Sequence, residues 1–216
     1  MGTILRTWSY QYQWLYDSIS RVAAIAVGGE HRFRRLALAG LEISPHAKIL
    51  DLCCGSGQVT QVLLEHSDDV TGLDVSPLSL SRSRRNAPQA KYVEALAEEM
   101  PFADREFDLV HTSAAMHEMT RSQLVEIFTQ VYRVLKPGGT FTTVDFHQPT
   151  NPLFKPGLAA FFWLFETQTA WALIELDLVA MLRDVGFTID STPILYAGGS
   201  LQVIQAHKQL TVVNPS

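Results

Sequence analysis

The stretch Ile49-Leu-Asp-Leu-Cys-Cys-Gly-Ser-Gly57 joins an apolar strand pattern to a glycine turn. Its aliphatic residues suit a strand that is covered on both faces, and residues 58–64 after the turn have helical spacing. Gly55 and Gly57 let the backbone approach a ligand closely, and α/β proteins bind nucleotides where such a strand passes into a helix. The stretch therefore predicts a nucleotide-binding turn.

Two acidic residues mark the ends of the first two predicted strands. Asp51 lies at the end of the strand in the opening stretch, and Asp74 closes the second apolar strand, Val70-Thr-Gly-Leu-Asp74. An acid at the second position accepts hydrogen bonds from the two hydroxyls of a ribose in α/β nucleotide sites. We therefore expect a cofactor that contains ribose.

Composition limits the class of protein. A chain of 216 residues with 47% hydrophobic and 18% charged residues predicts one domain, spanning 1–216. The formal net charge of −5 argues against a nucleic-acid partner, which would need a clustered basic surface. The longest wholly apolar run, residues 158–165, is well short of the roughly 20 residues of a spanning helix. We expect a cytoplasmic monomer or homodimer with a small-molecule substrate.

The cysteine and histidine patterns give no sign of a metal site or a disulfide. Cys53 and Cys54 are adjacent, so they cannot link distant segments, and a reducing compartment fits them. The six histidines other than His117 are too scattered for ligand spacing. No metal is predicted.

The order of elements predicts a parallel sheet. After a helical N-terminal segment, about 10–41, short apolar strands alternate with helical patterns, which is typical of a sheet with right-handed crossovers. The strands are expected at 48–52, 69–74, 91–94, 107–112 and 140–145, and the helices near 57–65, 77–86 and 121–135. Lys136-Pro-Gly-Gly139 should end the last helix and supply the reversal into the next strand.

The C-terminal part departs from this repeat. It has a long apolar segment at 153–176, a helix near 177–185 closed by Gly186, and strands at about 187–195 and 200–206. The glycine turn Tyr196-Ala-Gly-Gly199 suits a hairpin between the last two strands. We therefore expect a parallel sheet that finishes in a hairpin.

The glycine turn alone leaves two cofactors open. Gly55-Ser-Gly57 followed by Thr60 is an incomplete G-x-G-x-x-G, and the spacing to Asp74 also fits the nicotinamide fingerprint. Dinucleotide enzymes use a third glycine where this chain has Thr60. The carboxylate of Asp51 suits a cationic or hydroxyl-bearing ligand better than a diphosphate. An NAD(P)-dependent oxidoreductase remains the alternative, as does a protein that binds the cofactor without catalysis.

Five motifs occur in an order that resembles a known family. They are Asp51-Leu-Cys-Cys-Gly-Ser-Gly57, Gly72-Leu-Asp-Val-Ser76, Ala97-Glu-Glu-Met-Pro-Phe-Ala-Asp-Arg-Glu-Phe-Asp-Leu-Val110, Met116-His117 and Arg133-Val-Leu-Lys-Pro-Gly-Gly139. Together they resemble the signature blocks of class I S-adenosylmethionine-dependent methyltransferases. The resemblance covers roughly 47–206 and is closest to the branch of the ubiquinone/menaquinone-biosynthesis C-methyltransferases.

The resemblance implies a fold and a set of cofactor contacts. The fold is α/β, a Rossmann-like seven-stranded sheet of order 3-2-1-4-5-7-6 with strand 7 antiparallel and helices on both faces. S-adenosyl-L-methionine would be the cofactor and S-adenosyl-L-homocysteine the product. Residues implied to bind it are Asp51, Cys53, Gly55, Gly57, Asp74, Val75, Ala97, Glu98 and the carbonyl of Thr112.

Two positions depart from the family pattern. Cys53 stands where the first glycine of the turn is usual, so we expect the backbone there to avoid a strongly positive φ. Leu96 stands where the family commonly has an acid that accepts from the adenine amino group; Glu98 or Glu94 would have to substitute.

His117 is the candidate catalytic residue. It follows the fourth strand, where it would face the cofactor's methyl group, and a histidine can serve as a general base near neutral pH. A surface or helix-capping role beside Glu118 and Thr120 is an equal alternative. A further expectation is that Tyr12 or Tyr16 of an N-terminal lid, residues 1–45, closes over the cofactor.

The apolar segment bears on the substrate. The expected parts are a cofactor-binding core at 46–146, a cover segment at 147–176 and a C-terminal helix and hairpin at 177–208. Residues 153–176 are rich in Phe and Trp, which favours a hydrophobic acceptor such as a prenylated quinol or a lipid-like molecule, or peripheral membrane contact. An ordinary core helix or dimer surface is equally compatible with this composition.

Overall fold

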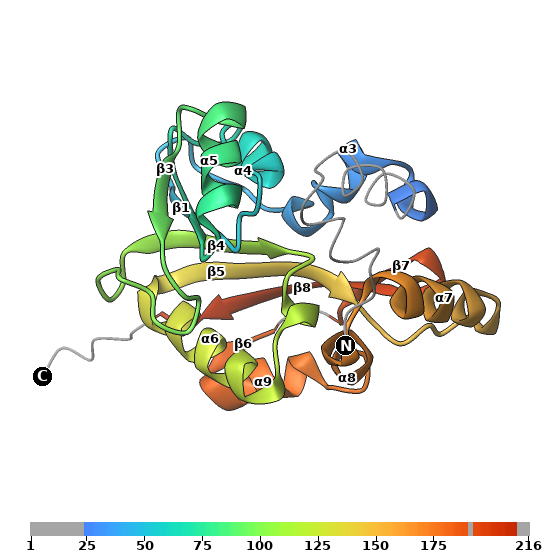
Figure 1. Cartoon of the computed structure of the whole chain (residues 1–216). Helices are drawn as coiled ribbons and strands as arrows, with labels where there is room; N and C mark the ends of the chain where they lie inside the picture. The colour runs from blue at the N-terminus through green and yellow to red at the C-terminus, as the bar shows by residue number, and fades with distance from the viewer. Residues whose placement is uncertain (1–23, 190–191, 211–216) are drawn as a thin grey trace, which may run out of the picture.

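A mixed sheet forms the centre of the molecule (Figure 1). The computed structural model describes residues 24–189 and 192–210, and in them the strand order is β3-β2-β1-β4-β5-β8-β6, with β7 also paired to β8. The strands are β1 (Lys48–Leu52), β2 (Asp69–Asp74), β3 (Lys91–Glu94), β4 (Phe107–Ser113), β5 (Leu135–Phe146), β6 (Phe187–Thr188), β7 (Ile194–Tyr196) and β8 (Leu201–Lys208). The first five are parallel and β8 is antiparallel to β5. The expected order 3-2-1-4-5-7-6 is confirmed, with β8 in the place of strand 7.

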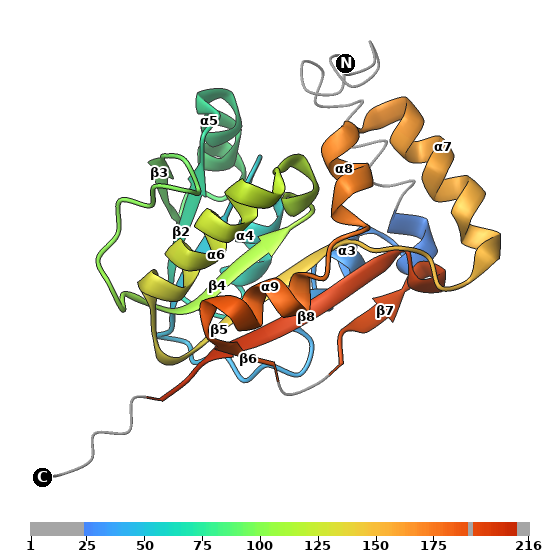
Figure 2. The same ribbon diagram turned by 90° about the horizontal axis from the view of Figure 1, so that it is seen from below.

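Helices cover both faces of the sheet (Figures 1 and 2). They are α3 (Glu30–Phe33), α4 (Gln58–Leu63), α5 (Pro77–Asn86), α6 (Arg121–Val134), α7 (Lys155–Phe165), α8 (Gln168–Leu173) and α9 (Leu178–Val185). Short 3-10 turns are η1 (Ile25–Val27), η2 (Leu36–Leu38), η3 (Met116–Glu118), η4 (Pro152–Phe154) and η5 (Ala197–Gly199). Helices α4 and α5 lie on one face and α6 and α9 on the other, as right-handed crossovers require.

Local sequence fixes where the main helices begin. The Ser76 hydroxyl accepts from the Ser79 amide, and proline occupies the next position of α5. Thr120 and Gln123 form a reciprocal capping box at the start of α6. Because these caps satisfy amides that have no partner inside the helix, the loops that end at them are held in place. Those loops carry much of the functional site.

The core explains why β1 is almost wholly apolar. Leu50 and Leu52 belong to the hydrophobic cluster that includes α6 and α9. Ile49 points to the opposite face and belongs to the cluster with Val62 and Leu63 of α4. Because successive residues of a strand face opposite sides, a strand that is buried on both faces needs an unbroken apolar run. Asp51 is the one acidic residue in this buried strand.

Two strands differ from the sequence prediction. Strand β5 begins at Leu135 and not at residue 140. Phe107 of β4 pairs with Leu135 and Leu109 pairs with Thr140, so the glycine pair at 138–139 lies in a bulge between these two pairings. The single strand expected at 187–195 is two short strands, β6 and β7, which both pair with β8. The expected hairpin through Tyr196-Ala-Gly-Gly199 is confirmed by the pairing of β7 with β8.

The N-terminal and apolar segments form short helices. From Ala24 onward, the expected N-terminal helix is replaced by three short elements, η1, α3 and η2. The earlier part of that helix, with Tyr12 and Tyr16, lies outside the described residues. The apolar segment forms α7 and α8 beside the carboxyl end of β5 (Figure 2). Among the described residues, none of the helices has the length and hydrophobicity that a membrane span requires.

Candidate active site

A large cavity lies at the carboxyl ends of the parallel strands. Its volume is about 1150 Å³, and its walls come from the turn after β1, the end of β2, residues 95–98, the end of β4, η3 and α7. Small-molecule sites usually hold roughly 300–1,000 Å³. The cavity therefore has room for a nucleoside cofactor together with a second molecule.

Asp74 is at the cavity wall, where β2 ends. One carboxylate oxygen accepts from the Gly55 amide and the other from the Ser76 amide, both at 2.8 Å. These bonds fix the carboxylate against the glycine turn, and each oxygen retains a second lone pair. The side chain is half-buried and lines the cavity, so it both stabilises the turn and faces a ligand.

Asp51 is a buried acid behind the same turn. It is 2% exposed, accepts a hydrogen bond of 2.6 Å from the Thr60 hydroxyl, and lines the cavity. Burial raises the pKa of Asp51 to about 7, with a smaller contribution from the nearby Asp74 charge. A cationic or hydroxyl-bearing ligand at this position would favour its ionised form.

The turn corrects one sequence expectation. Cys53 does not avoid a positive φ: its φ is 57°, in the left-handed region that the usual glycine would occupy. Ala114, at the end of β4, also has a positive φ of 50°, and both residues line the cavity. Such strain clusters at binding sites, because it brings the backbone into position for a ligand.

The expected adenine contacts have different environments. Val75 is 59% exposed, and Ala97 and Glu98 also line the cavity. Glu98 accepts a 2.7 Å hydrogen bond from the Gln123 side chain at the start of α6. Leu96, 48% exposed, is at the same wall, so an apolar side chain stands where the resemblance implies an acid.

Two expected cofactor residues do not line the cavity. Gly57 is the N-cap of α4, with φ 81°, and a side chain there would lie 3.1 Å from the Ser83 backbone. Thr112 is fully buried within β4, and the cavity wall begins one residue later, at Ser113. A contact of either residue with the cofactor therefore stays a prediction.

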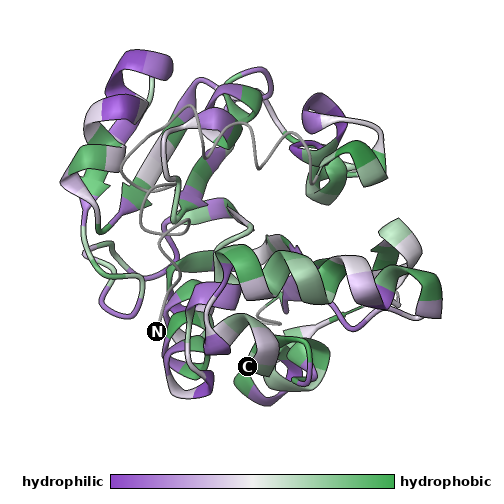
Figure 3. Cartoon of the chain, turned by 45° about the vertical axis from the view of Figure 1, so that its right-hand side comes forward, coloured by the Kyte–Doolittle hydropathy of each residue, from purple (hydrophilic) through white to green (hydrophobic). Residues whose placement is uncertain are grey.

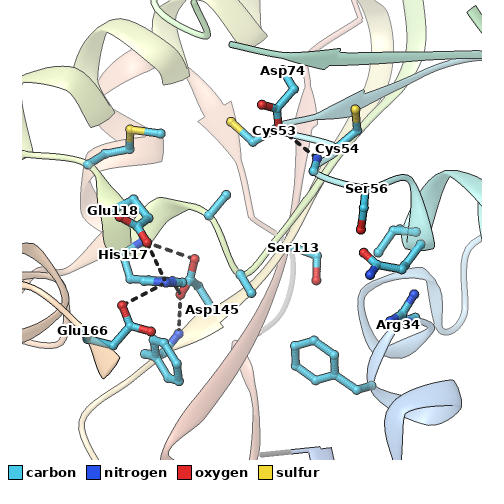
Figure 4. A pocket seen from close by; sticks show the side chains of 18 of the residues that line it. Arg34, Cys53, Cys54, Ser56, Asp74, Ser113, His117, Glu118, Asp145 and Glu166 are labelled. Carbon is cyan, nitrogen blue, oxygen red and sulfur yellow. Dashed lines mark hydrogen bonds and ion pairs between the residues drawn. The ribbon is translucent and has the colours of Figure 1, made fainter. Parts of the chain in front are cut away.

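His117 is at the centre of a cluster of acids on the opposite wall from Asp74 (Figure 4). Its Nδ1 is 2.8 Å from an Asp145 carboxylate oxygen. Its Nε2 is 3.5 Å from Glu166 and 3.9 Å from Glu118. The residue is 6% exposed, which rules out the alternative of a surface histidine.

The charges around His117 determine its ionisation. Burial of the imidazole acts to lower its pKa, but the carboxylates of Asp145, Glu166 and Glu118 outweigh this and raise the pKa of His117 to about 9. At neutral pH the ring is therefore an imidazolium that donates hydrogen bonds from both nitrogens.

Asp145 positions that ring. One of its oxygens accepts from the Met116 amide at 2.7 Å, and the other accepts from the His117 ring and the Phe146 amide at 2.8 Å each. It is 1% exposed at the end of β5. Because so many donors converge on one carboxylate, His117 is held with Nε2 toward the Glu166 and Glu118 side of the cavity.

Sequence reasoning did not select Asp145, Glu118 or Glu166. The position of Asp145 at the carboxyl end of a parallel strand is the same signal that identified Asp51 and Asp74. Glu166 follows directly after α7, in which Lys155 is the one charged residue. A buried carboxylate beside an apolar helix lowers the stability of the fold unless it has a charged or hydrogen-bonding partner. The partner of Glu166 is His117.

Aromatic rings surround the His117 cluster on the α7 side. Phe146 packs edge-on against the His117 ring at 4.8 Å between centroids. Phe161 of α7 lies 5.8 Å from Phe146 and 5.4 Å from Phe165. All three phenylalanines line the cavity, so this end of it is apolar and suited to an aromatic molecule.

The two cysteines are unsuited to thiol chemistry. Both are free, and burial, together with nearby carboxylates, raises their pKa well above the usual value for a thiol. They therefore remain protonated, which disfavours both nucleophilic attack and metal ligation.

The fold and the cavity fit a nucleoside cofactor, and comparisons with known proteins identify the class of enzyme. A methyltransferase-domain family model matches residues 49–139. An uncharacterized methyltransferase of Synechocystis sp. is 58% identical over 98% of this chain and 100% of its own. The demethylmenaquinone methyltransferase of Lactiplantibacillus plantarum is 31% identical over 65% of this chain and 62% of its own. A solved S-adenosylmethionine-dependent methyltransferase from Methanosarcina mazei superposes with a TM-score of 0.61 at 23% identity, covering 78% of this chain and 95% of that one.

The chain belongs to the class I S-adenosylmethionine-dependent methyltransferases. It is an enzyme of that family and its cofactor is S-adenosylmethionine, so the nicotinamide alternative is set aside. The residues fit this cofactor: a fixed carboxylate at the end of β2 suits ribose hydroxyls, and the exposed Val75 beside it offers an apolar surface to adenine.

Proposed function

We propose that this methyltransferase acts on an aromatic, oxygen-bearing acceptor with an apolar tail, of the prenylated-quinol kind. The proposal rests on one observation: the aromatic side chains of Phe146 and Phe161 lie next to His117, a buried hydrogen-bond donor. A quinol ring offers both complements: a face that packs on phenylalanine and an oxygen that accepts a hydrogen bond.

The relative from Lactiplantibacillus plantarum supports this acceptor class through its name, demethylmenaquinone methyltransferase. The apolar lining at α7 supports the tail. Figure 3 shows hydrophobic residues along much of that helix, and Leu158 and Phe165 line the cavity beside Phe161. These residues offer a continuous apolar path from the His117 cluster toward the surface.

S-adenosylmethionine, when bound, supplies a methyl group on a sulfonium that is already reactive. The protein's own part is to bind and orient. In this proposal Asp74 holds the ribose hydroxyls, Asp51 carries negative charge toward the cationic end of the cofactor, and Glu98 lies along the adenine edge. Phe146 and Phe161 exclude water and hold the acceptor ring in line with the methyl group, which supplies much of the rate enhancement.

His117 is proposed as the residue that contacts the acceptor's oxygen. A general base would have to be deprotonated, whereas the acids around His117 keep it protonated at neutral pH. We therefore propose that Nε2–H donates to the oxygen and favours the acceptor's phenolate form, whose proton has been lost to solvent, so that the methyl group is transferred to an electron-rich ring. Asp145 is the positioning residue that keeps the imidazolium in place.

The outer face of the α7 region is proposed as a peripheral membrane contact on the cytoplasmic side. Trp163 is 74% exposed and outside the cavity lining, and Leu153, which is 85% exposed, lies at the edge of the cavity. Lipid contact there would let an acceptor with a long tail enter the cavity without crossing water. Co-sedimentation with phospholipid vesicles measures this, and the paired substitutions Leu153→Ser and Trp163→Ser should reduce it while S-adenosylmethionine binding stays unchanged.

Transfer of an isotope-labelled methyl group tests the acceptor class. The protein is incubated with labelled S-adenosylmethionine and prenylated hydroquinones, short-chain hydroquinones, simple phenols or aliphatic amines. We expect the prenylated hydroquinones to give the highest kcat/KM and the amines no product. Phe161→Ala should raise KM at least tenfold for the prenylated acceptor, and His117→Gln should lower kcat by about 100-fold or more.

Two results would count against the proposal. A preference for amines would overturn the acceptor class. Full turnover by His117→Gln would remove the histidine's role and leave the acceptor class standing. Because protonated His117 is the proposed active form, activity should decline as pH rises through about 9, and an increase over that range would indicate a base.

A further inference from the structure

The cluster around His117 contains a set of donor atoms that metal ions use. Nε2 of His117, one carboxylate oxygen of Glu118 and one of Glu166 lie within 4.8 Å of one another. The donors come from two separate parts of the chain, η3 and the residue after α7, which the fold brings together at the cavity wall.

The spacing of these atoms is close to that of a metal site. Zinc binds histidine nitrogen and carboxylate oxygen at about 2.0–2.2 Å, so donors in a tetrahedral site are roughly 3.4 Å apart. The distances from Nε2 to Glu166 and Glu118 are 3.5 and 3.9 Å. The Glu118 side chain is 26% exposed, so it is less tightly enclosed than the His117 ring, which is 7% exposed.

The surroundings of His117 also match those of a metal ligand. Metal-bound histidines almost always donate their other ring N–H to a carboxylate or carbonyl, which fixes the ring and makes the ligating nitrogen more basic. Nδ1 of His117 makes that bond to Asp145, which is itself held by backbone amides. This second observation does not depend on the two glutamates.

We propose that His117, Glu118 and Glu166 form a binding site for a divalent first-row transition metal ion, such as Mn²⁺ or Zn²⁺, with its remaining positions open to the cavity. One imidazole and two carboxylates suit these ions, whereas Mg²⁺ prefers oxygen ligands alone. Because the proton on Nε2 and the ion exclude each other, the ion would take over the contact with an acceptor's oxygen. The proposal concerns the same site as the proposed function: it keeps the acceptor class, and in the metal-bound protein the ion replaces the N–H of His117 as the group that contacts the acceptor's oxygen.

Metal binding is measured on the full chain, freed of metal with EDTA and kept without cofactor or acceptor. Calorimetric titration with Mn²⁺ and separately with Zn²⁺ should show one site per chain. Glu166→Gln and Glu118→Gln should each weaken binding at least tenfold, and Asp145→Asn should weaken it by about 10–100-fold. Glu126→Gln, on the exposed face of α6 and outside the cavity lining, is the matched control and should leave binding unchanged.

Two further measurements separate the outcomes. Each variant should bind S-adenosylmethionine like the wild type, which shows that it is folded. The electron paramagnetic resonance signal of free Mn²⁺ should diminish with wild type and the control, and much less with Glu166→Gln at the same concentrations. Absence of binding, or binding that both glutamate variants retain, overturns the metal site without bearing on methyl transfer. A site that binds metal while the acceptor panel shows no product overturns only the proposed function.

Discussion

Asp74 is the residue on which cofactor binding most depends. Its carboxylate is fixed by two amides and faces the cavity, so its replacement removes charge-assisted hydrogen bonds to the ribose. We expect Asp74→Ala to weaken S-adenosylmethionine binding by roughly 10–100-fold, because one such bond contributes about 1.5–3 kcal/mol. Calorimetric titration gives the affinity, and circular dichroism should be unchanged.

The matched control for Asp74 lies at the other end of the same strand. Asp69 begins β2 and pairs with Lys91 at 2.8 Å, far along the strand from the cavity end. Asp69→Ala should keep wild-type cofactor affinity. Equal losses in both variants would show that damage to β2, and not loss of a ribose contact, caused the effect.

Asp51 makes the unfolding free energy depend on pH. Its pKa is raised from 3.8 to about 7 in the folded protein, so this residue favours folding fully below pH 3.8, and that contribution is lost as pH rises through 7. His111 has the opposite effect: burial lowers its pKa from 6.5 to about 3, so its stabilising contribution is lost as pH falls below 6.5. Between pH 4 and 6.5 the two residues therefore change the free energy of unfolding in opposite directions as pH rises: Asp51 lowers it and His111 raises it.

Replacing Asp51 removes its effect on the pH dependence of stability and leaves that of His111. We expect the stability of Asp51→Asn, relative to wild type, to rise with pH by about 1.4 kcal/mol per unit between pH 5 and 6.5, the linkage slope for one proton. Urea unfolding at three pH values in that range measures the difference. Parallel pH profiles for the two proteins would show that Asp51 has an ordinary pKa.

At the scale of elements, the glycine turn controls how closely α4 approaches α5. Gly57 has φ 81°, and a side chain there would lie 3.1 Å from the Ser83 backbone. Gly57→Ala should therefore lower the free energy of unfolding by about 1–3 kcal/mol. Gly157→Ala in α7, where a side chain would meet nothing within 4 Å, should be neutral or stabilise by about 0.5–1 kcal/mol. Urea unfolding compares them, and a cost at both sites would argue against close packing as the cause.

The elements that could be predicted from sequence are those with a local cause. The strand at 48–52 is apolar on both faces and α6 has a continuous apolar stripe, so the sequence locates both closely. The division of 187–195 into β6 and β7 does not follow from the sequence pattern, because it depends on pairing with β8, which is a tertiary contact. The backbone at Cys53 was misjudged because the site imposes a conformation that a cysteine does not itself favour.

The candidate site could be predicted only in part, for a similar reason. Asp51 and Asp74 end strands, which is visible in the sequence. Glu166 lies 49 residues after His117 and reaches it only because α7 returns along the end of the sheet. No spacing rule brings those two positions together.

For the whole molecule, the cofactor should stabilise the fold by mass action. A ligand at 100 times its Kd adds about 2.7 kcal/mol to the free energy of unfolding, which corresponds to a rise in Tm of roughly 5–10 °C for a chain of this size. We expect that shift with S-adenosylmethionine and none with NAD. Asp74→Ala should show a much smaller shift, and an equal response to both cofactors would argue against selective binding.

The edge strands of the sheet affect how readily the protein self-associates at high concentration. At one rim β3 has four residues, with Lys91 and Glu94 exposed; at the other, β6 and β7 divide the edge of β8 into pieces of two and three residues. Strands this short, one of them with charged ends, give a neighbouring chain little backbone on which to add a strand of its own. Self-association through cross-molecule β pairing is therefore disfavoured at both rims.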